Sequence, residues 1–127
     1  MNLSDYFEKV RGLGILATAD SNGMVDLAVY AKPYVIDKNT IAFVMQERLT
    51  HQNLKSNPHA AYMFVEKGEG FAGKRLYLTK IREETNTSVV EMFRKKQPEI
   101  CASYDDSNKY LVHFQIDDIR PLVGDTT

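Results

Sequence analysis

Turn residues divide this chain into short apolar segments, and that division constrains the fold more than any other feature of the sequence. Residues 20–23 contain an Asn-Gly pair that suits a tight hairpin, and residues 37–40 form a second polar turn. Between residues 25 and 35 the odd positions are apolar, which is the period of a strand with one buried face. The pattern predicts antiparallel strands joined by hairpins, with the odd positions of residues 25–35 in the core.

Six segments of the sequence have strand character, and three have helical character. We expect strands over residues 14–19, 25–35, 41–45, 60–65, 75–83 and 110–117. We expect helices over residues 4–10, 50–56 and 87–96, the first with Ser4 as N-cap and the second ended by Asn57 and Pro58. Pro33 cannot donate a ladder hydrogen bond, so the second strand should bend or end near it. Helices do not alternate with strands, which favours a small antiparallel barrel over a doubly wound sheet.

Composition limits both the size of the protein and its partners. The 127 residues, 43% of them hydrophobic, predict a single domain over residues 1–127. A net charge of -1 gives no basic surplus for a nucleic acid. The apolar segments are much shorter than the roughly 20 residues that cross a bilayer. We therefore expect no membrane span. One cysteine, Cys101, excludes an intramolecular disulfide, and with no secretory signal we expect a cytoplasmic protein.

The segment between the third and fourth expected strands carries the best candidate for a binding site. Arg48 and Thr50 stand at the expected start of a helix, where backbone N–H groups and a partial positive charge favour an anion such as a phosphate. Spacing alone favours a purely structural interpretation: Thr50 is then an N-cap, Asn53 returns a capping bond, and Arg48 is a solvated charge.

An ordered set of residues resembles the pyridoxamine 5'-phosphate oxidase-like family and its small bacterial FMN-binding members. The similarity runs from about residue 13 to residue 122, and its motifs are Leu16-Ala17-Thr18-Ala19-Asp20, Gly23, Arg48-Leu49-Thr50-His51-Gln52-Asn53-Leu54, Ser56-Asn57-Pro58 and Gly73-Lys74-Arg75-Leu76-Tyr77-Leu78. The resemblance implies a mainly β fold, a six-stranded antiparallel FMN-binding split barrel of Greek-key type. It also implies a homodimer with cofactor sites at the subunit interface, and a flavin-dependent oxidoreductase that uses a small-molecule substrate or electron donor.

The same resemblance assigns roles to individual positions. The phosphate loop of the family is matched by Arg48, Leu49 and Thr50, and the helix behind it by Gln52 and Asn53. The strand beside the flavin ring is matched by Ala28, Val29, Tyr30 and Ala31. We expect Tyr30, Lys32 and Tyr34 on one polar strand face. There they would either pack beside the ring, with Lys32 near its pyrimidine edge, or form a dimer contact or an exposed strand face. Lys74 or Arg75, from a neighbouring strand or subunit, would add positive charge. The true oxidases carry an Arg-Lys pair at the positions of Leu49 and Thr50, so oxidation of vitamin B6 is not expected.

The remaining polar residues predict less. His51 should donate a ring N–H to phosphate or water, while His51, His59 and His113 lack the spacing of a metal site, so no metal is expected. Glu83 and Glu84 are expected in a solvated turn. Two other functions stay open: a non-catalytic module that binds haem or another flavin-like cofactor, and a dimeric barrel without a cofactor.

Overall fold

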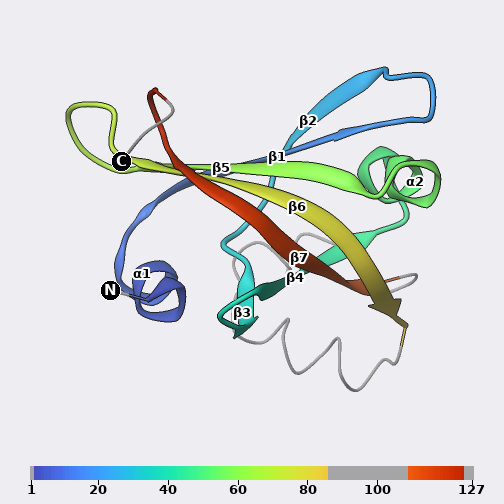
Figure 1. Cartoon of the computed structure of the whole chain (residues 1–127), viewed down its shortest axis with the longest axis horizontal. Coiled ribbons are helices and arrows are strands. Elements are labelled where there is room, and N and C mark those ends of the chain that lie inside the picture. Colours follow the sequence, from blue (N-terminus) through green and yellow to red (C-terminus); the bar gives the residue numbers. More distant parts are fainter. Residues whose placement is uncertain (1, 86–108, 125–127) are drawn as a thin grey trace.

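The structure is a computed structural model, and it describes residues 2–85 and 109–124. These residues form two helices and seven strands (Figure 1). Their bounds are α1 Leu3–Lys9, β1 Gly12–Ala19, β2 Val25–Val29, β3 Tyr34–Asp37, β4 Thr40–Gln46, α2 Leu49–Ser56, β5 His59–Glu66, β6 Gly73–Glu84 and β7 Lys109–Pro121. The mainly antiparallel β fold predicted from the hairpins is confirmed.

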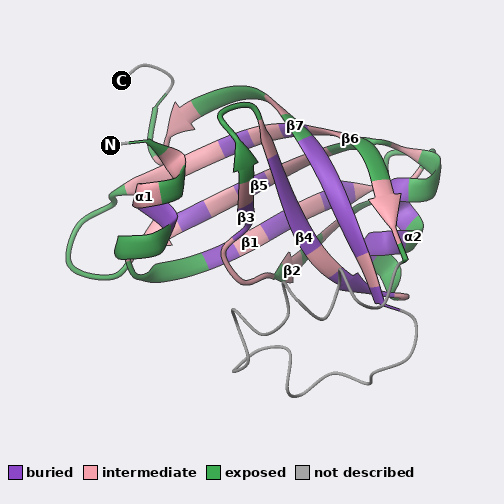
Figure 2. Ribbon diagram, turned by 90° about the horizontal axis from the view of Figure 1, so that it is seen from below, coloured by how far each residue is buried: buried purple, intermediate pink, exposed green. Residues whose placement is uncertain are grey.

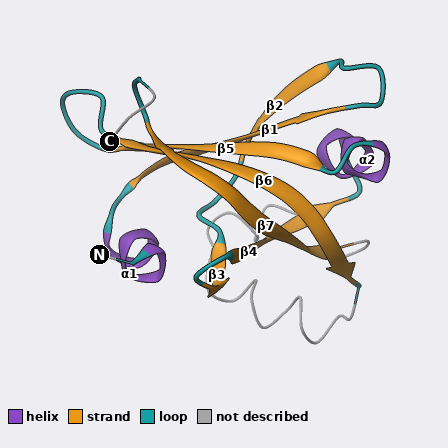
Figure 3. Cartoon of the chain, in the orientation of Figure 1, coloured by secondary structure: helices purple, strands orange, loops and turns teal. Residues whose placement is uncertain are grey.

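All seven strands belong to one sheet with the order β2-β1-β5-β6-β7-β4-β3, and every neighbouring pair is antiparallel (Figure 3). β4 and β5 are not neighbours in this order, yet the ring centroids of Phe43 and Tyr62 are 5.0 Å apart. The sheet must therefore coil around a shared core. Its two edge strands, β2 and β3, are joined by residues 30–33, and this is where the barrel is split.

The core is aromatic and aliphatic, and the two helices lie at opposite ends of the sheet (Figures 1 and 2). α1 contributes Tyr6 and Phe7, whose rings contact Phe64 edge to face. α2 contributes Leu54 to the same cluster from the other end. Each helix therefore packs its apolar side chains against the interior rather than against the outside of the sheet.

The second expected strand is in fact two strands, which is why the sheet has seven strands instead of six. β2 ends at Val29 and β3 begins at Tyr34, with Pro33 in the break as predicted. The expected core face of β2 was wrong: Val25, Leu27 and Val29 are 81%, 69% and 61% exposed. Asp26 pairs with the buried Thr18 of β1 and shares its face, so the other face of β2 points toward α2 and the apolar residues point outward.

Those exposed residues are part of a larger surface. Directly opposed residues of antiparallel strands share a face, and the register therefore continues the exposed side of β2 across β1 and β5. We call this surface the outer apolar face, and its residues are Leu13, Ile15, Ala17, Val25, Leu27, Val29, Ala61, Met63 and Val65. At its β6 border stand Tyr77 and Arg75, which pair with Ala61 and Met63. A face of this kind is unusual for a protein surface in contact with water.

Several element ends differ from the sequence-based expectations by a few residues. Asn2, not Ser4, caps α1, because its side-chain oxygen accepts from the Asp5 N–H at 2.8 Å. α2 begins at Leu49, and β6 and β7 extend to Glu84 and Pro121. The helix expected over residues 87–96 and Cys101 lie outside the described residues. Within the described ranges, neither helix has the length and apolar character needed to cross a bilayer.

Gly14 is required by the packing of Tyr62. A Cβ atom built on Gly14 would lie 1.8 Å from the Tyr62 hydroxyl oxygen and 2.6 Å from the Tyr30 carbonyl oxygen. The Tyr62 hydroxyl donates toward the Tyr30 and Ala31 carbonyl oxygens at 3.4 and 3.2 Å, and burial raises the pKa of this phenol. Tyr62 thus needs the absence of a side chain at position 14.

We expect Gly14→Ala to lower the free energy of unfolding by about 1–3 kcal/mol, because the added methyl group overpacks the core and displaces backbone at the strand break. Urea unfolding followed by circular dichroism measures this. Gly23→Ala is the comparison, because a Cβ atom at position 23 would meet no atom within 4 Å. Gly23 has a positive φ, so any destabilisation of this variant reports backbone strain and not overpacking. A Gly14→Ala protein as stable as the wild type would contradict the close approach.

Candidate cofactor site

The start of α2 has the features of an anion-binding helix terminus. Arg48 is the N-cap residue but forms no side-chain capping bond, and no acidic residue stands in the first turn. The first N–H groups of a helix have no partner within the helix, so a negatively charged ligand is favoured at such an end. Thr50 is a buried residue inside the helix, which makes the N-cap interpretation of Thr50 wrong.

The side chain of Arg48 is held by the turn that precedes the helix. Its Nε donates to the Gln46 side-chain oxygen at 2.9 Å, and its backbone N–H donates to the Gln46 carbonyl at the same distance. Gln46 itself is buried at the end of β4. The guanidinium group is therefore oriented by a strand of the barrel before any ligand arrives.

Asn53 attaches the helix to the barrel and does not return a capping bond. Its side-chain N–H donates to the Thr18 hydroxyl oxygen at 3.1 Å, and both residues are buried. A hydrogen bond between two buried polar groups is costly to lose, because either group alone would remain unsatisfied. This contact fixes α2 against β1.

His51 is fully buried and is enclosed by groups from this chain. Its Nδ1 lies 3.0 Å from a Glu47 carboxylate oxygen, and its Nε2 lies 3.1 Å from both carboxylate oxygens of Glu83. Its ring stacks on Tyr110 with centroids 4.0 Å apart and an interplanar angle of 17°. We call Glu47, His51, Glu83 and Tyr110 the His51 clamp. Both ring nitrogens face carboxylates. The His51 N–H that we expected to contact a phosphate therefore faces Glu47 or Glu83 instead.

The clamp shifts the titration of its acidic members. The hydrogen bond with His51 lowers the pKa of Glu47, assisted by Tyr110 and Lys55 and opposed by desolvation. Desolvation raises the pKa of Glu83, but hydrogen bonds from Lys80, at 2.6 Å, and from His51 outweigh it and leave the pKa below its ordinary value. The hydrogen bond to Glu47 raises the pKa of Tyr110.

The expectation of a solvated turn at Glu83 and Glu84 was wrong, because β6 continues through both residues and leaves them half-buried. Glu84 lies 3.1 Å from Nε2 of His113, while Nδ1 of His113 is buried without a hydrogen-bond partner. Burial lowers the pKa of His113, with Arg82 assisting and Glu84 opposing. Within the described ranges, no three histidine, cysteine or acidic residues are grouped as metal ligands.

The segment expected beside the flavin ring lies at the split of the barrel. Ala28 and Val29 end β2, and Tyr62 holds the next two residues, Tyr30 and Ala31, through their carbonyl oxygens. The prediction that Tyr30, Lys32 and Tyr34 share one polar strand face was wrong, because the strand is broken between Val29 and Tyr34. The Tyr30 ring contacts Phe43 edge to face in the core, whereas Tyr34 packs with Ala42 and Leu111 in a separate cluster.

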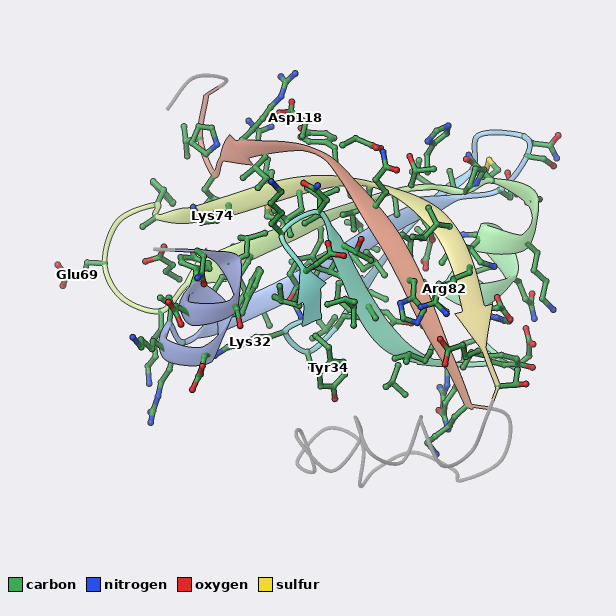
Figure 4. All side chains as sticks on the ribbon, turned by 60° about the horizontal axis from the view of Figure 1, so that its bottom comes forward. Lys32, Tyr34, Glu69, Lys74, Arg82 and Asp118 are labelled. Atoms are coloured by element: carbon green, nitrogen blue, oxygen red, sulfur yellow. The ribbon has the colours of Figure 1, made fainter. Side chains whose placement is uncertain are left out.

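Lys74 stands at the other end of the sheet from α2 (Figure 4), and Arg75 follows it in β6. The Lys74 ammonium lies 4.8 Å from the centroid of the Tyr6 ring of α1. Arg75 donates to the Pro121 carbonyl at 2.8 Å, and to the Gly124 carbonyl and the Tyr77 hydroxyl. The structure therefore brings residues 48–53 together at one end, and does not bring Lys74 or Arg75 to them within one chain.

Sequence reasoning missed the groups that support the helix start. Glu47 stands four residues before His51, and this spacing is a visible signal of a side-chain pair, although Glu47 itself precedes the helix. Glu83 and Tyr110 are 32 and 59 positions away along the chain, and Thr18 is 35 positions before Asn53. Only the folding of the sheet and the packing of α2 against it bring these residues close.

We expect the His51 clamp to stabilise the fold at neutral pH and to lose this effect in acid. A carboxylate whose folded pKa is lowered contributes stability above its unfolded pKa, about 4.5, and loses the contribution as the pH falls through the lower folded value. The free energy of unfolding of wild type should therefore exceed that of Glu83→Gln at pH 7, and the difference should shrink steadily below about pH 4.5. Urea titrations from pH 3 to pH 7 measure it, and a pH-independent difference would contradict the linkage.

Comparison with known proteins places the fold. No family model matches the sequence, and no curated protein matches it. Among solved structures, an FMN-binding protein of Syntrophomonas wolfei is similar with a TM-score of 0.78 and 19% identity, over 95% of this chain and 84% of that chain. HupZ of Group A Streptococcus is similar with a TM-score of 0.75 and 16% identity, over 98% and 95%.

A protein of Lactobacillus delbrueckii that carries the provisional name pyridoxamine 5'-phosphate oxidase is also similar. Its TM-score is 0.66 at 17% identity, over 94% of this chain and 91% of that chain. These likenesses extend over nearly the whole chain in each case, and the strand arrangement described above accounts for them. The chain therefore has the split-barrel fold of the FMN-binding and pyridoxamine 5'-phosphate oxidase-like proteins.

Proposed function

We propose that this protein binds FMN and holds the phosphate at the start of α2. The observation that carries the proposal is a helix start without a side-chain cap, next to an oriented arginine, on a fold shared with an FMN-binding protein. The phosphate would accept from the first-turn N–H groups and from Arg48, with the Thr50 hydroxyl beside it. Charge-assisted bonds of this type are about twice as strong as neutral ones.

The rest of the proposed site orients the flavin. Residues 28–31 offer a backbone edge for the ring, and Tyr62 keeps this edge in place from inside the barrel. Lys32 follows directly and supplies a positive charge near that edge. When bound, FMN supplies two-electron and one-electron redox chemistry, and we propose an oxidoreductase that acts on a small molecule. Leu49 and Thr50 offer less charge than an Arg-Lys pair, so we do not propose vitamin B6 as the substrate.

We also propose a homodimer formed through the outer apolar face. Residues 28–31 follow one border of that face and Arg75 stands at the other. A two-fold axis along the strands would bring the β2 border of one copy over the β6 border of its partner, so that each site receives a cation from the second subunit. This arrangement would bury the exposed apolar residues and explain why a single chain separates Arg48 from Arg75.

We expect wild-type protein to bind FMN and to quench its fluorescence. The double variant Arg48→Ala, Thr50→Ala should bind FMN at least tenfold more weakly, because charge-assisted hydrogen bonds contribute about 1.5–3 kcal/mol each. Arg11→Ala removes an exposed arginine elsewhere and is the matched control. Riboflavin, which lacks the phosphate, should bind both proteins equally. Wild-type protein that does not bind FMN would refute the proposed function.

We expect the wild type to sediment as a dimer, and Leu27→Glu to sediment as a monomer, because the variant places a charge on the β2 side of the outer apolar face, where the partner copy would cover it. Analytical ultracentrifugation at micromolar concentration measures this. Ile36→Glu changes another exposed apolar strand residue, outside that face, and should stay dimeric. A monomeric wild type, or a dimeric Leu27→Glu protein, would contradict the proposed interface.

A further inference from the structure

Glu47 stands at a position where its carboxylate could compete with an anionic ligand. It directly precedes Arg48, the N-cap of α2, and acidic groups are attracted to the positive end of a helix. A carboxylate released at this point would be attracted to the unpaired first-turn N–H groups that the proposed phosphate would use. Yet the structure shows no side-chain capping bond at this helix start.

The His51 clamp accounts for this absence. The Glu47 carboxylate contacts His51 at 3.0 Å and Lys55 at 3.4 Å, and it accepts a hydrogen bond from Tyr110. His51 and Lys55 stand one and two turns further along α2, so these contacts draw the carboxylate along the helix side and away from its start. His51 in turn is fixed by Glu83 of β6 and by stacking on Tyr110 of β7.

We propose that His51 is a positioning residue that keeps the Glu47 carboxylate away from the start of α2 and so leaves this helix end open for the phosphate of the ligand. The inference rests on the proposed FMN site. It assigns His51 a role distinct from contact with the phosphate, since its own nitrogens are engaged by Glu47 and Glu83.

A purely structural role for the histidine predicts something different. A structural histidine would matter for stability, and its loss would weaken every ligand of the fold alike. A residue that restrains a competing carboxylate should instead affect only ligands with a phosphate, and removal of the competing charge should reverse its loss. Removing the Glu47 charge therefore separates the two roles.

The test compares the affinities of FMN and riboflavin, measured by fluorescence quenching, so that only the contribution of the phosphate is followed. We expect His51→Gln to reduce the FMN-to-riboflavin affinity ratio about tenfold. His51→Gln, Glu47→Gln should restore the ratio to within about twofold of wild type. His59→Gln, a change at an exposed histidine of β5, is the matched control and should leave the ratio unchanged.

A second readout needs no flavin. Inorganic phosphate is titrated while the first-turn amides of α2 are followed by NMR, and the same order of affinities is expected. An unchanged FMN-to-riboflavin ratio in His51→Gln, or a double variant that is not restored, would overturn the inference. A wild type that binds FMN no better than riboflavin would refute the proposed phosphate site itself.

If His51→Gln does not fold, Tyr110→Phe replaces it in the affinity test. It keeps the stacked ring and removes only the hydroxyl that donates to Glu47. The FMN-to-riboflavin ratio should then fall in Tyr110→Phe and recover in Tyr110→Phe, Glu47→Gln. A ratio that does not follow this order would overturn the inference in the same way.

Discussion

Tyr62 connects the parts of this barrel that no backbone ladder connects. Its ring packs on Phe43 across the interior, and its hydroxyl reaches the carbonyl oxygens at the break between the two edge strands. The sheet therefore coils around an aromatic contact, and the split between β2 and β3 is held from within. The close approach leaves no space for a side chain at Gly14. Core packing and the shape of the proposed flavin edge thus depend on one residue.

Most of the fold was predictable because its signals are local. The Asn-Gly turn, the polar turn at residues 37–40 and Asn57-Pro58 marked hairpins and a helix end within a residue or two. The orientation of β2 was not predictable in the same way. Alternation shows that the two faces of a strand differ, but the inner face of β2 meets α2 and carries Asp26, while its apolar face is outside.

In the candidate site, too, local features were predictable from the sequence and long-range contacts were not. Arg48 to Asn53 form one continuous segment, so a helix start with an arginine was visible in the sequence. The groups that orient this segment come from elsewhere: Gln46 ends β4, Thr18 lies in β1 and Glu83 lies near the end of β6. These contacts follow from strand order and register, which propensities of single residues do not encode. The sequence therefore indicated the residues of the proposed site better than the residues that support them.

The outer apolar face has a consequence for how this chain reaches its folded state. β2 is an edge strand, and edges beside exposed apolar residues promote pairing with other chains during folding. If a second copy covers this face, association removes that hazard, and part of the free energy of unfolding then depends on protein concentration. Dilution would act on this protein much as a denaturant does. The same residues would set both how well the chain assembles and how long it survives in the cell.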